Sequence, residues 1–443
     1  MSIPPSMTRR KFLQLGGVTL AAGAGARGFG FAKHHSDDAL LDHLSQGCFA
    51  YFRDAMDPET GICRDLIHGN PDDNARKGDE PRGSTGVTGF ALTSLCIGSD
   101  RRWIPRDRAK DLVRRALRSY TSGKVFCEHG WFYHFVDVHT GQRWKEVEMS
   151  TSDSIWLLAG ALTCRQYFHE DHEISDLATL LYSRYDFPWM TNGDGKLLSH
   201  GWRPEGFIKF RYDKYCQLAA MYLLGIGSPT HPLPPEAWYA WERTPNSYGQ
   251  YNYIGTSLLW TYQYPFAWFD FRGRRESRGT KVEWFANCQI ATRAHREWCF
   301  TDLAKQFPDY TQDVWGITSS SSPTGYRAWG GPPMHSKIDG SVVPCAAGGS
   351  LMLTPDVCIS AMHAIKEKYG SRIGGKNGIW GKYGFADAFN PLTGWVSTDT
   401  LGLDVGMTLL SAENLRSGSV WKWFMANAEP QKAMHLAGVD RIS

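Results

Sequence analysis

Residues 201–233, GWRPEGFIKFRYDKYCQLAAMYLLGIGSPTHPL, decide how the rest of the chain is interpreted. Their second half, 214–226, is rich in apolar residues and predicts a helix. We expect this helix to stop at Gly227-Ser228-Pro229, because glycine and proline commonly follow the end of a helix. The first half belongs to a long connection, 186–212, that is rich in glycine, proline and aromatic residues. Gln217 therefore lies near the start of a helix that follows a long loop.

Helical patterns dominate the remaining chain and tend to come in pairs. Strand patterns are few, and the clearest, 131–137, precedes a turn at 139–141. Paired helices with long loops at one end are typical of an all-α (α/α)6 toroid with a few short strands on one face. Pairing alone does not require the ring to close. Besides 214–226, the expected helices cover 39–53, 88–98, 106–121, 153–168, 174–185, 281–305, 355–369, 405–416 and 420–435.

The N-terminus has the pattern of an export signal. Arg9-Arg10 precedes a short apolar segment, 15–26, that is rich in small residues. A twin-arginine pair before a weakly hydrophobic core indicates a Tat signal peptide. The core is shorter than the roughly 20 residues that a transmembrane helix needs, so we expect no stable membrane insertion. Residues 1–32 are then the signal and 33–443 a single periplasmic or secreted domain, with the Tat translocase as partner during export.

Composition and motifs exclude several other classes. The net charge of +3 is too small to indicate nucleic acid, and the basic run 101–118 alternates with apolar residues as the solvent face of a helix does. The ten cysteines form no CxxC pair, and a protein folded before Tat export needs no disulfide framework. His129, His134 and His139 recur at intervals of five, which neither a helix nor a strand presents on one face, so no zinc site is visible in the sequence. The Gly-x-Ser-x-Gly nucleophile motif, the His-Glu-x-x-His metalloprotease motif and the P-loop are missing, and the GxGxxG at 23–28 follows no strand.

Aromatic residues are abundant, with 18 Trp, 19 Tyr and 22 Phe. Many lie in polar, glycine-containing loops rather than in helical stripes. Aromatic faces stack on the apolar faces of sugar rings, while polar groups at the rim bond the hydroxyls. The alternative is that these large side chains fill space between long loops. As a set they favour a sugar-binding cleft, and the examples are Trp131, Trp202, Trp268, Trp315 and Trp329.

Cleavage of a glycoside normally requires two carboxyl groups, one protonated and one ionised. Glu148 lies just ahead of a predicted helix and has no evident structural role, and its neighbour Glu146 could keep it partly protonated. Asp153 follows Ser150 by three residues, so a helix-capping role is favoured there.

Three further acidic residues have structural alternatives. Asp404 stands before the helix 405–416, where it could cap the helix or project into a cleft. An internal ion pair is the favoured interpretation of Glu413. Asp270 and Arg272 alternate as on an extended segment and could form a salt bridge.

Several blocks, in order along the chain, resemble the bacterial glycoamylase-like proteins, a group that includes the endo-β-1,2-glucanases of glycoside hydrolase family 144. The similarity is strongest over about 191–420. It implies an (α/α)6 toroid, export, and action on a β-glucan without metal or organic cofactor. The blocks are 84–98 (STGVTGFALTSLCIG), 129–137 (HGWFYHFVD), 148–162, 201–232, 263–272, 314–318 (VWGIT), 380–389 (WGKYGFADAF), 402–406 (GLDVG) and 413–418 (ENLRSG).

The resemblance also implies site residues, and here the chain departs from the family pattern. The acidic position ahead of the Ser-Thr-x-Asp helix matches Glu148, whereas the second family carboxylate matches Gln217. The loop 262–266 and the pair Gln312-Asp313 also differ from the family residues. An amide can bond a hydroxyl but cannot donate a proton as an acid does. Loss of general acid assistance typically costs about 10²–10⁴ in rate.

We therefore expect an exported glycoside hydrolase or transglycosylase that acts on an oligo- or polysaccharide such as β-1,2-glucan. Glu148 and Asp404 form its acid–base pair, with Gln217 as a substrate ligand. The alternatives are a catalytically silent glycan-binding relative and, less favoured, a phosphorylase-like enzyme. The substrate-binding residues that we assign are Trp131, Tyr133, His134, Trp202, Arg211, Tyr215, Gln263, Trp268, Asp270, Arg272, Trp315 and Tyr326.

Overall fold

The computed structural model describes residues 26–68, 81–334, 337–371 and 378–442, with side chains from Ser36 onward. The twin-arginine pair Arg9-Arg10 lies outside these residues, as does most of the predicted signal. Within them the fold is mostly helical, as predicted, and no helix is long and apolar enough to cross a membrane. The longer helices are α2 (Ala26–Ala55), α3 (Thr85–Asp100), α4 (Arg106–Thr121), α5 (Thr151–Tyr167), α6 (His172–Arg184), α8 (Leu218–Gly227), α10 (Trp284–Thr301), α12 (Pro355–Tyr369), α13 (Gly402–Arg416) and α15 (Ala428–Leu436).

Helices α3 and α5 form the tightest contact in the core. A Cβ atom added at Gly89 would lie 2.1 Å from the Trp156 carbonyl oxygen, and one at Gly160 would lie 2.1 Å from the Gly89 carbonyl oxygen. Only glycine permits two helix backbones to approach this closely. The contact brings the N-terminal ends of both helices together, and a Cβ at Gly86 would lie 2.4 Å from Asp153 Oδ1.

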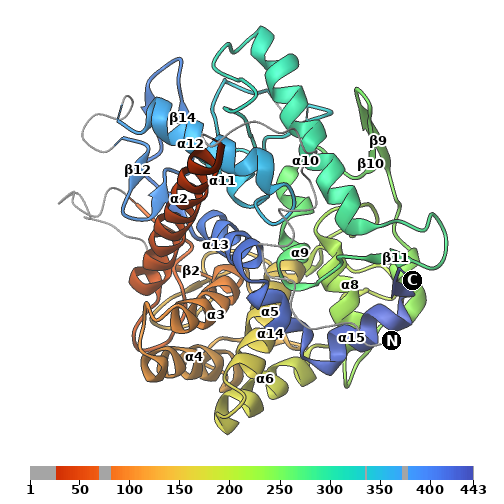
Figure 1. The fold of residues 1–443 in the computed structure, drawn as a ribbon. Helices are drawn as coiled ribbons and strands as arrows, with labels where there is room; N and C mark the ends of the chain where they lie inside the picture. Colours follow the sequence, from red (N-terminus) through yellow and green to blue (C-terminus); the bar gives the residue numbers. More distant parts are fainter. Residues whose placement is uncertain (1–25, 69–80, 335–336, 372–377, 443) are drawn as a thin grey trace.

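The other buried helices follow one another around the same core (Figure 1). Helix α5 packs on α8, α8 on the short α9 (Tyr264–Trp268), and α13 on both α11 (Pro344–Gly348) and α3. The Gln263 amide, just before α9, donates to the Ala346 carbonyl on α11 at 2.9 Å. Outside them, α4 packs on α3, α6 on α5, α15 on α8, α12 on α11 and α2 on α13. These contacts support the (α/α)6 toroid, which stays a prediction.

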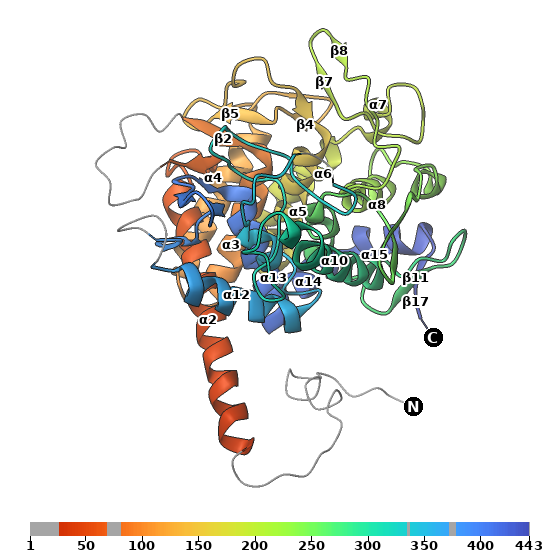
Figure 2. The same cartoon turned by 90° about the horizontal axis from the view of Figure 1, so that it is seen from above.

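Short antiparallel strands lie in the connections, and β2, β4, β5, β7 and β8 lie together along the upper edge of Figure 2. They position the loops that surround the N-terminal ends of α3, α5 and α13. The pairs nearest these ends are β1 (Leu66–Ile67) with β16 (Thr400–Leu401), β2 (Arg82–Ser84) with β5 (Phe135–Asp137), β3 (Cys127–Glu128) with β4 (Trp131–Phe132), and β6 (Met149–Ser150) with β7 (Gly201–Arg203) and β8 (Gly206–Phe207).

The remaining elements lie further from these helix ends. The short helices are α7 (Phe187–Met190) and α14 (Ser419–Met425). The other strand pairs are β9 (Pro245–Tyr248) with β10 (Tyr251–Ile254), β11 (Arg274–Glu276) with β17 (Val439–Arg441), β12 (Trp380–Gly381) with β13 (Gly384–Phe385), and β14 (Phe389–Asn390) with β15 (Trp395–Val396).

Three predicted elements need correction. The strand 131–137 is two strands, because the chain leaves β3 after Phe132 and pairs with β2 only from Phe135. The helix 420–435 is α14 and α15, since Pro430 has no N–H to continue a helix and lies in the first turn of α15. The helix 214–226 starts later, at Leu218, with Gln217 as its N-cap residue.

Two predicted ion pairs form, one with an unexpected partner. Asp270 Oδ1 accepts from Arg272 Nε at 2.7 Å, as predicted. Glu413 is buried and binds Arg101, with Nε to Oε2 at 2.9 Å, whereas the nearby Arg416 pairs with Asp42. Glu413 is thus a structural residue that joins α13 to the end of α3.

Candidate active site

A cavity of about 640 Å³ lies at the N-terminal ends of α5, α8 and α13. Side chains of these helices line it, together with the segment before β6, the β1–β16 pair and the turn 319–326. Five of the residues assigned from the sequence lie on its wall: His134, Glu148, Gln217, Tyr326 and Asp404. Both predicted catalytic carboxyl groups therefore face one cavity.

Glu148 is held by a cation. His134 Nδ1 lies 3.2 Å from Glu148 Oε1, and Arg203 Nη2 lies 3.6 Å from Glu148 Oε2. The hydrogen bond from His134 lowers the pKa of Glu148 to about 2. Glu148 is thus ionised at neutral pH, and the expectation that Glu146 keeps it partly protonated is wrong. The hydrogen bond from the charged His134 decides the protonation state of Glu148, and Glu146 does not.

His134 itself sits between two carboxylates. Its Nε2 atom lies 3.5 Å from Asp153 Oδ2, on the side away from Glu148. Burial alone would lower the pKa of His134, but the charges of Asp153 and Glu148 raise it to about 9. Ser150 is the N-cap of α5, because its Oγ accepts from the Asp153 N–H at 3.2 Å; the same hydroxyl donates to Asp153 Oδ2 at 2.5 Å, so Asp153 takes part in the helix cap as predicted. Asp153 therefore both supports the start of the helix and helps to hold the histidine charged.

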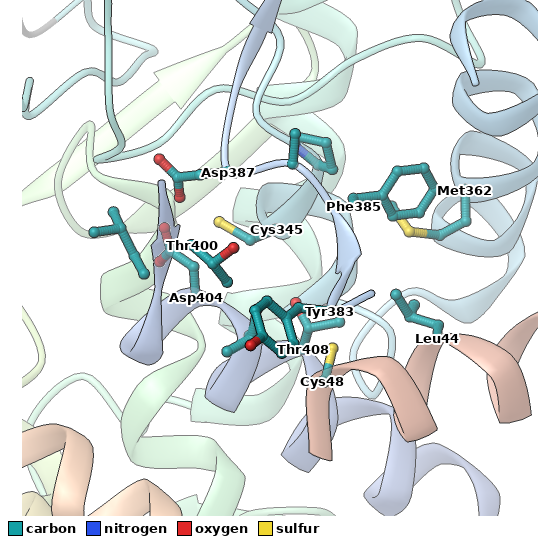
Figure 3. A pocket seen from close by; sticks show the side chains of 14 residues that line it. Leu44, Cys48, Cys345, Met362, Tyr383, Phe385, Asp387, Thr400, Asp404 and Thr408 are labelled. Carbon is teal, nitrogen blue, oxygen red and sulfur yellow. The ribbon is translucent and has the colours of Figure 1, made fainter. Parts of the chain in front are cut away.

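The surroundings of Asp404 favour its protonated form, whereas those of Glu148 favour the ionised form. It is in the first turn of α13 but is not its N-cap, which is Leu401, so its side chain is free to face the cavity. It is 9% exposed, and Asp387 adjoins it together with Cys345 (Figure 3). Burial and the charge of Asp387 raise the pKa of Asp404 well above its usual range. Asp404 therefore retains a proton that a carboxyl group in water would lose.

Sequence analysis assigned no role to several residues of this wall, nor to Asp387, which adjoins Asp404 behind it. Asp387 is buried and its pKa is raised, chiefly by burial. Asp65 pairs with Arg82 at 2.9 Å, and burial raises its pKa. Burial lowers the pKa of His200. Asp387 stands within the block 380–389 that carried the family resemblance, so that block was the signal for it. Trp260 and Tyr264 supply the aromatic surface of the cavity.

Gln217 and Tyr326 are placed to contact a ligand. Gln217 lies at the start of α8, where its side chain makes no capping hydrogen bond and lines the cavity. Tyr326 is 64% exposed, on a turn closed by the backbone pair Ser320 and Arg327. Gln217 offers an amide to a ligand, and Tyr326 offers an exposed aromatic face.

Most aromatic residues assigned to the cleft lie elsewhere. Trp131, Trp268 and Trp315 are fully buried, so they offer no face to a sugar, and the space-filling alternative is correct for them. Their indole groups serve the core, as when Trp268 Nε1 donates to Thr93 Oγ1 at 3.1 Å. Tyr215 is also buried and stacks on Trp284 at 5.4 Å between ring centroids.

The other assigned binding residues have structural contacts outside the cavity lining. Gln263 is buried and bonds α11 as described above. The Arg211 guanidinium donates to the carbonyls of Thr191 and Leu197. Arg272 lies over Trp421 and binds Asp270. The last two, Tyr133 and Trp202, contact Arg143 and Trp189 respectively.

No group of three or more His, Cys, Asp or Glu side chains is arranged to hold a metal ion in the described part of the chain. The same part contains ten free cysteines, most of them buried. The side chains that line the cavity offer carboxyl groups, imidazoles, an amide, hydroxyls and the guanidinium of Arg82.

Comparison with known proteins identifies the class. Residues 209–428 match the family model described as "Glycoamylase: Putative glucoamylase". The chain is 25% identical over 438 residues to an exo β-1,2-glucooligosaccharide sophorohydrolase (non-reducing end) of Parabacteroides distasonis. That alignment covers 90% of this chain and 58% of the relative, so the chain spans little more than half the relative's length.

Two solved structures are similar to this chain over most of its length. An endo-β-1,2-glucanase from Chitinophaga pinensis, in complex with sophorotriose and glucose, superposes with a TM-score of 0.82 at 25% identity, covering 91% of this chain and 98% of that one. A β-1,2-glucanase from Parabacteroides distasonis has a TM-score of 0.81 at 24% identity, covering 91% and 60% of the two chains. The chain is a glycoamylase-family protein, related to endo-β-1,2-glucanases and to the sophorohydrolase.

Proposed function

We propose that this protein is a glycoside hydrolase acting on β-1,2-glucan or a closely related glucan, with Asp404 as the acid and Glu148 as its ionised partner. The observation that carries the proposal is the contrast between two carboxyl groups on one cavity wall, one with a raised pKa and one with a lowered pKa. Such a pair is what glycoside hydrolysis requires. The relatives supply the substrate class, since one binds sophorotriose and glucose and another is named for β-1,2-glucooligosaccharides.

In the proposed reaction, Asp404 gives its proton to the glycosidic oxygen as the bond to the anomeric carbon breaks. A water molecule adds to that carbon, and its proton passes to Glu148. A carboxylate with a pKa of about 2 is a weak base. Its larger contribution is therefore to stabilise the positive charge that develops on the sugar ring. His134 keeps this carboxylate ionised through the hydrogen bond between them.

Gln217 supports the proposal as a substrate ligand. Its amide can donate to one sugar hydroxyl and accept from another, although it cannot donate a proton as an acid does. Tyr326, Trp260 and Tyr264 provide aromatic faces on the same cavity for the sugar rings. The cavity volume of about 640 Å³ lies within the range of small-molecule sites.

The proposal includes the finer features that the sequence predicts. These are an (α/α)6 toroid as the scaffold, a Tat signal over residues 1–32, and a periplasmic or secreted location. A fusion of residues 1–40 to a folded reporter tests export, because a Tat signal carries it across the membrane and Arg9→Lys with Arg10→Lys stops it.

The mature protein should be incubated with linear β-1,2-glucan and with β-1,3-, β-1,4- and β-1,6-glucans, and the products followed by chromatography and anomeric NMR. We expect oligosaccharides from β-1,2-glucan alone, and a rate lower by about 10²–10⁴ in Asp404→Asn and in Glu148→Gln. Full activity in either variant would remove that residue from the mechanism.

A second candidate function is supported by Gln217, which stands where the family resemblance places a carboxylate. If that carboxylate is indispensable, the protein is a glycan-binding relative without activity. Trp260 lines the cavity, so tryptophan fluorescence reports binding without turnover. Binding of β-1,2-glucan with no product, together with hydrolysis by Gln217→Glu, would establish this second function instead.

A further inference from the structure

We propose that Asp387 is a positioning residue that orients Asp404 and keeps one proton shared between the two carboxyl groups. The inference rests on the proposed function, because it explains how a chain with Gln217 in its cavity still has a carboxyl group ready to protonate a leaving oxygen. Asp387 itself lies in the second, smaller cavity behind Asp404 rather than on the wall of the large one.

The geometry fixes how Asp387 faces Asp404. Asp387 comes from the segment between β13 and β14, whereas Asp404 comes from the first turn of α13. The backbone N–H of Ser321 donates to Asp387 Oδ2 at 2.7 Å. This bond occupies Oδ2 and leaves the other oxygen, Oδ1, without a partner among the described residues, and Figure 3 shows the two carboxyl groups gathered with the Cys345 thiol.

The buried oxygens of the pair lack donors. Among the described residues, neither Asp387 Oδ1 nor Asp404 Oδ2 has a hydrogen-bond partner as long as both groups are ionised. A buried carboxylate oxygen without a donor is costly. A single proton between the groups removes one charge and also provides the missing donor, so it satisfies both oxygens at once.

The surroundings oppose a second charge. The carboxyl groups of Asp65 and Asp399 act against it. The neutral thiol of Cys345 and the neutral phenols of Tyr264 and Tyr326 also face the pair. Burial and the charge of Asp387 raise the pKa of Asp404 more than the hydrogen bond from this thiol lowers it. Arg82 pairs with Asp65, and His68 Nδ1 lies 2.8 Å from Asp399 Oδ1, so these partners are already engaged away from the pair. Two carboxylates this close cannot both ionise at low cost.

A cavity of about 20 Å³ adjoins the pair and is bordered by Thr400 and Thr408. It has room for one water molecule, which needs roughly 10–15 Å³. A water molecule there could donate to one carboxylate oxygen. It would not remove a charge, so the need for a shared proton remains.

The variant Asp387→Asn separates two roles of Asp387: its effect on the proton of Asp404, and its hydrogen bond to the turn 319–326. Asparagine keeps an oxygen that can accept from the Ser321 N–H, so the turn 319–326 stays attached. It replaces the negative charge by an amide that donates to Asp404, and that favours the ionised form of Asp404. The proton should therefore leave Asp404 at lower pH than in the wild type.

The first test is the pH dependence of kcat/KM on β-1,2-glucan. We expect the basic limb of Asp387→Asn to move to lower pH by about one unit or more, with KM for the glucan nearly unchanged. The matched control is Asp302→Asn, an exposed carboxylate that binds Lys305 and lies outside the cavity lining, and it should keep the wild-type profile. A profile of Asp387→Asn that superposes on the wild type would overturn the inference.

The second test needs no turnover. Infrared spectra report the C=O band of a protonated carboxyl group, and its loss with rising pH gives the titration directly. We expect the band at neutral pH in the wild type, its disappearance at lower pH in Asp387→Asn, and its absence in Asp404→Asn. Should Asp387→Asn not fold, Asp404→Asn alone decides, because a band that survives there contradicts the shared proton.

The two tests distinguish a failure of the proposed function from a failure of the role of Asp387. If no glucan is cleaved but the infrared titration shifts as expected, the proposed function fails and the carboxyl pair stands. If β-1,2-glucan is cleaved and neither the kinetic limb nor the infrared titration moves in Asp387→Asn, the role of Asp387 fails and the hydrolase stands.

Discussion

Glu148 and Asp404 lie on the same cavity, but their neighbours differ in charge. Glu148 has His134 and Arg203 beside it, and the hydrogen bond from His134 lowers its pKa to about 2. Asp404 is buried beside Asp387, and burial and the charge of Asp387 raise its pKa well above the usual range. The comparison shows that neighbours, rather than residue type, decide which carboxyl group donates a proton and which carries charge.

The largest effect should come from removing the proton donor. In Asp404→Asn we expect kcat to fall by about 10²–10⁴, because an amide cannot protonate the leaving oxygen. KM should change little, and a glucan carrying an activated leaving group should recover much of the rate. Steady-state kinetics on both substrates measure this. Equal loss on both substrates would mean that Asp404 is not the acid.

Replacing His134, the cation beside Glu148, should move the acid limb of the pH profile of kcat/KM. In His134→Gln the pKa of Glu148 should rise from about 2 toward its ordinary value, since the hydrogen bond from a charged donor is lost. Glu148 then takes up a proton at higher pH, and the acid limb of kcat/KM shifts upward by about one unit or more. His139→Gln, which removes a histidine paired with Asp57 outside the cavity lining, is the control. An unchanged acid limb in His134→Gln would contradict the account.

The same ion pair should contribute stability over a defined pH window. The pKa of His134 is raised to about 9, so its contribution is complete below its ordinary value of 6.5 and is lost as pH rises through about 9. The pKa of Glu148 is lowered, so its contribution is present above its ordinary value of 4.5 and is lost as pH falls through about 2. Between these limits we expect the wild type to melt on the order of a few °C above His134→Gln. Calorimetric melting curves across pH test this, and a constant difference at every pH would refute it.

The smallest effect should come from Gln217→Glu. Under the proposed function the amide bonds a sugar hydroxyl, and a carboxylate can accept from that hydroxyl but not donate to it. We expect kcat/KM to fall only a few-fold, about 0.5–1.5 kcal/mol, mainly through KM. Gln217→Asn, which keeps the amide on a shorter side chain, is the matched control. A large gain in kcat for Gln217→Glu would instead favour the silent glycan-binding function.

Much of the fold follows from local sequence patterns. The predicted helices 106–121 and 355–369 coincide with α4 and α12, because apolar periodicity runs through both and a proline, Pro105 or Pro355, marks each start. The predicted ends of helices and strands are wrong where tertiary contacts determine them. Helix α8 begins at Leu218 although the preceding residues also suit a helix. Similarly, β4 and β5 divide one apolar run between two partners.

The site was only partly predictable, for physical reasons. Glu148 and Asp404 were found because they lie at the starts of helices, just ahead of α5 and in the first turn of α13, and these helix ends meet at one cavity. Burial could not be read from the sequence, so Trp131 and Trp268 looked like loop aromatics although they are core residues. Asp387 was missed because its partner, Asp404, is close only in the folded chain. Protonation states depend on such partners, so they can be assigned only once the structure shows which groups are close.

The central claim is that Asp404 carries the proton and Glu148 carries the charge. The most direct measurement is the infrared band of the protonated carboxyl group at neutral pH in the wild type, Asp404→Asn and Glu148→Gln. The account predicts that the band is lost in Asp404→Asn and kept in Glu148→Gln. A band that survives in Asp404→Asn and disappears in Glu148→Gln would contradict it.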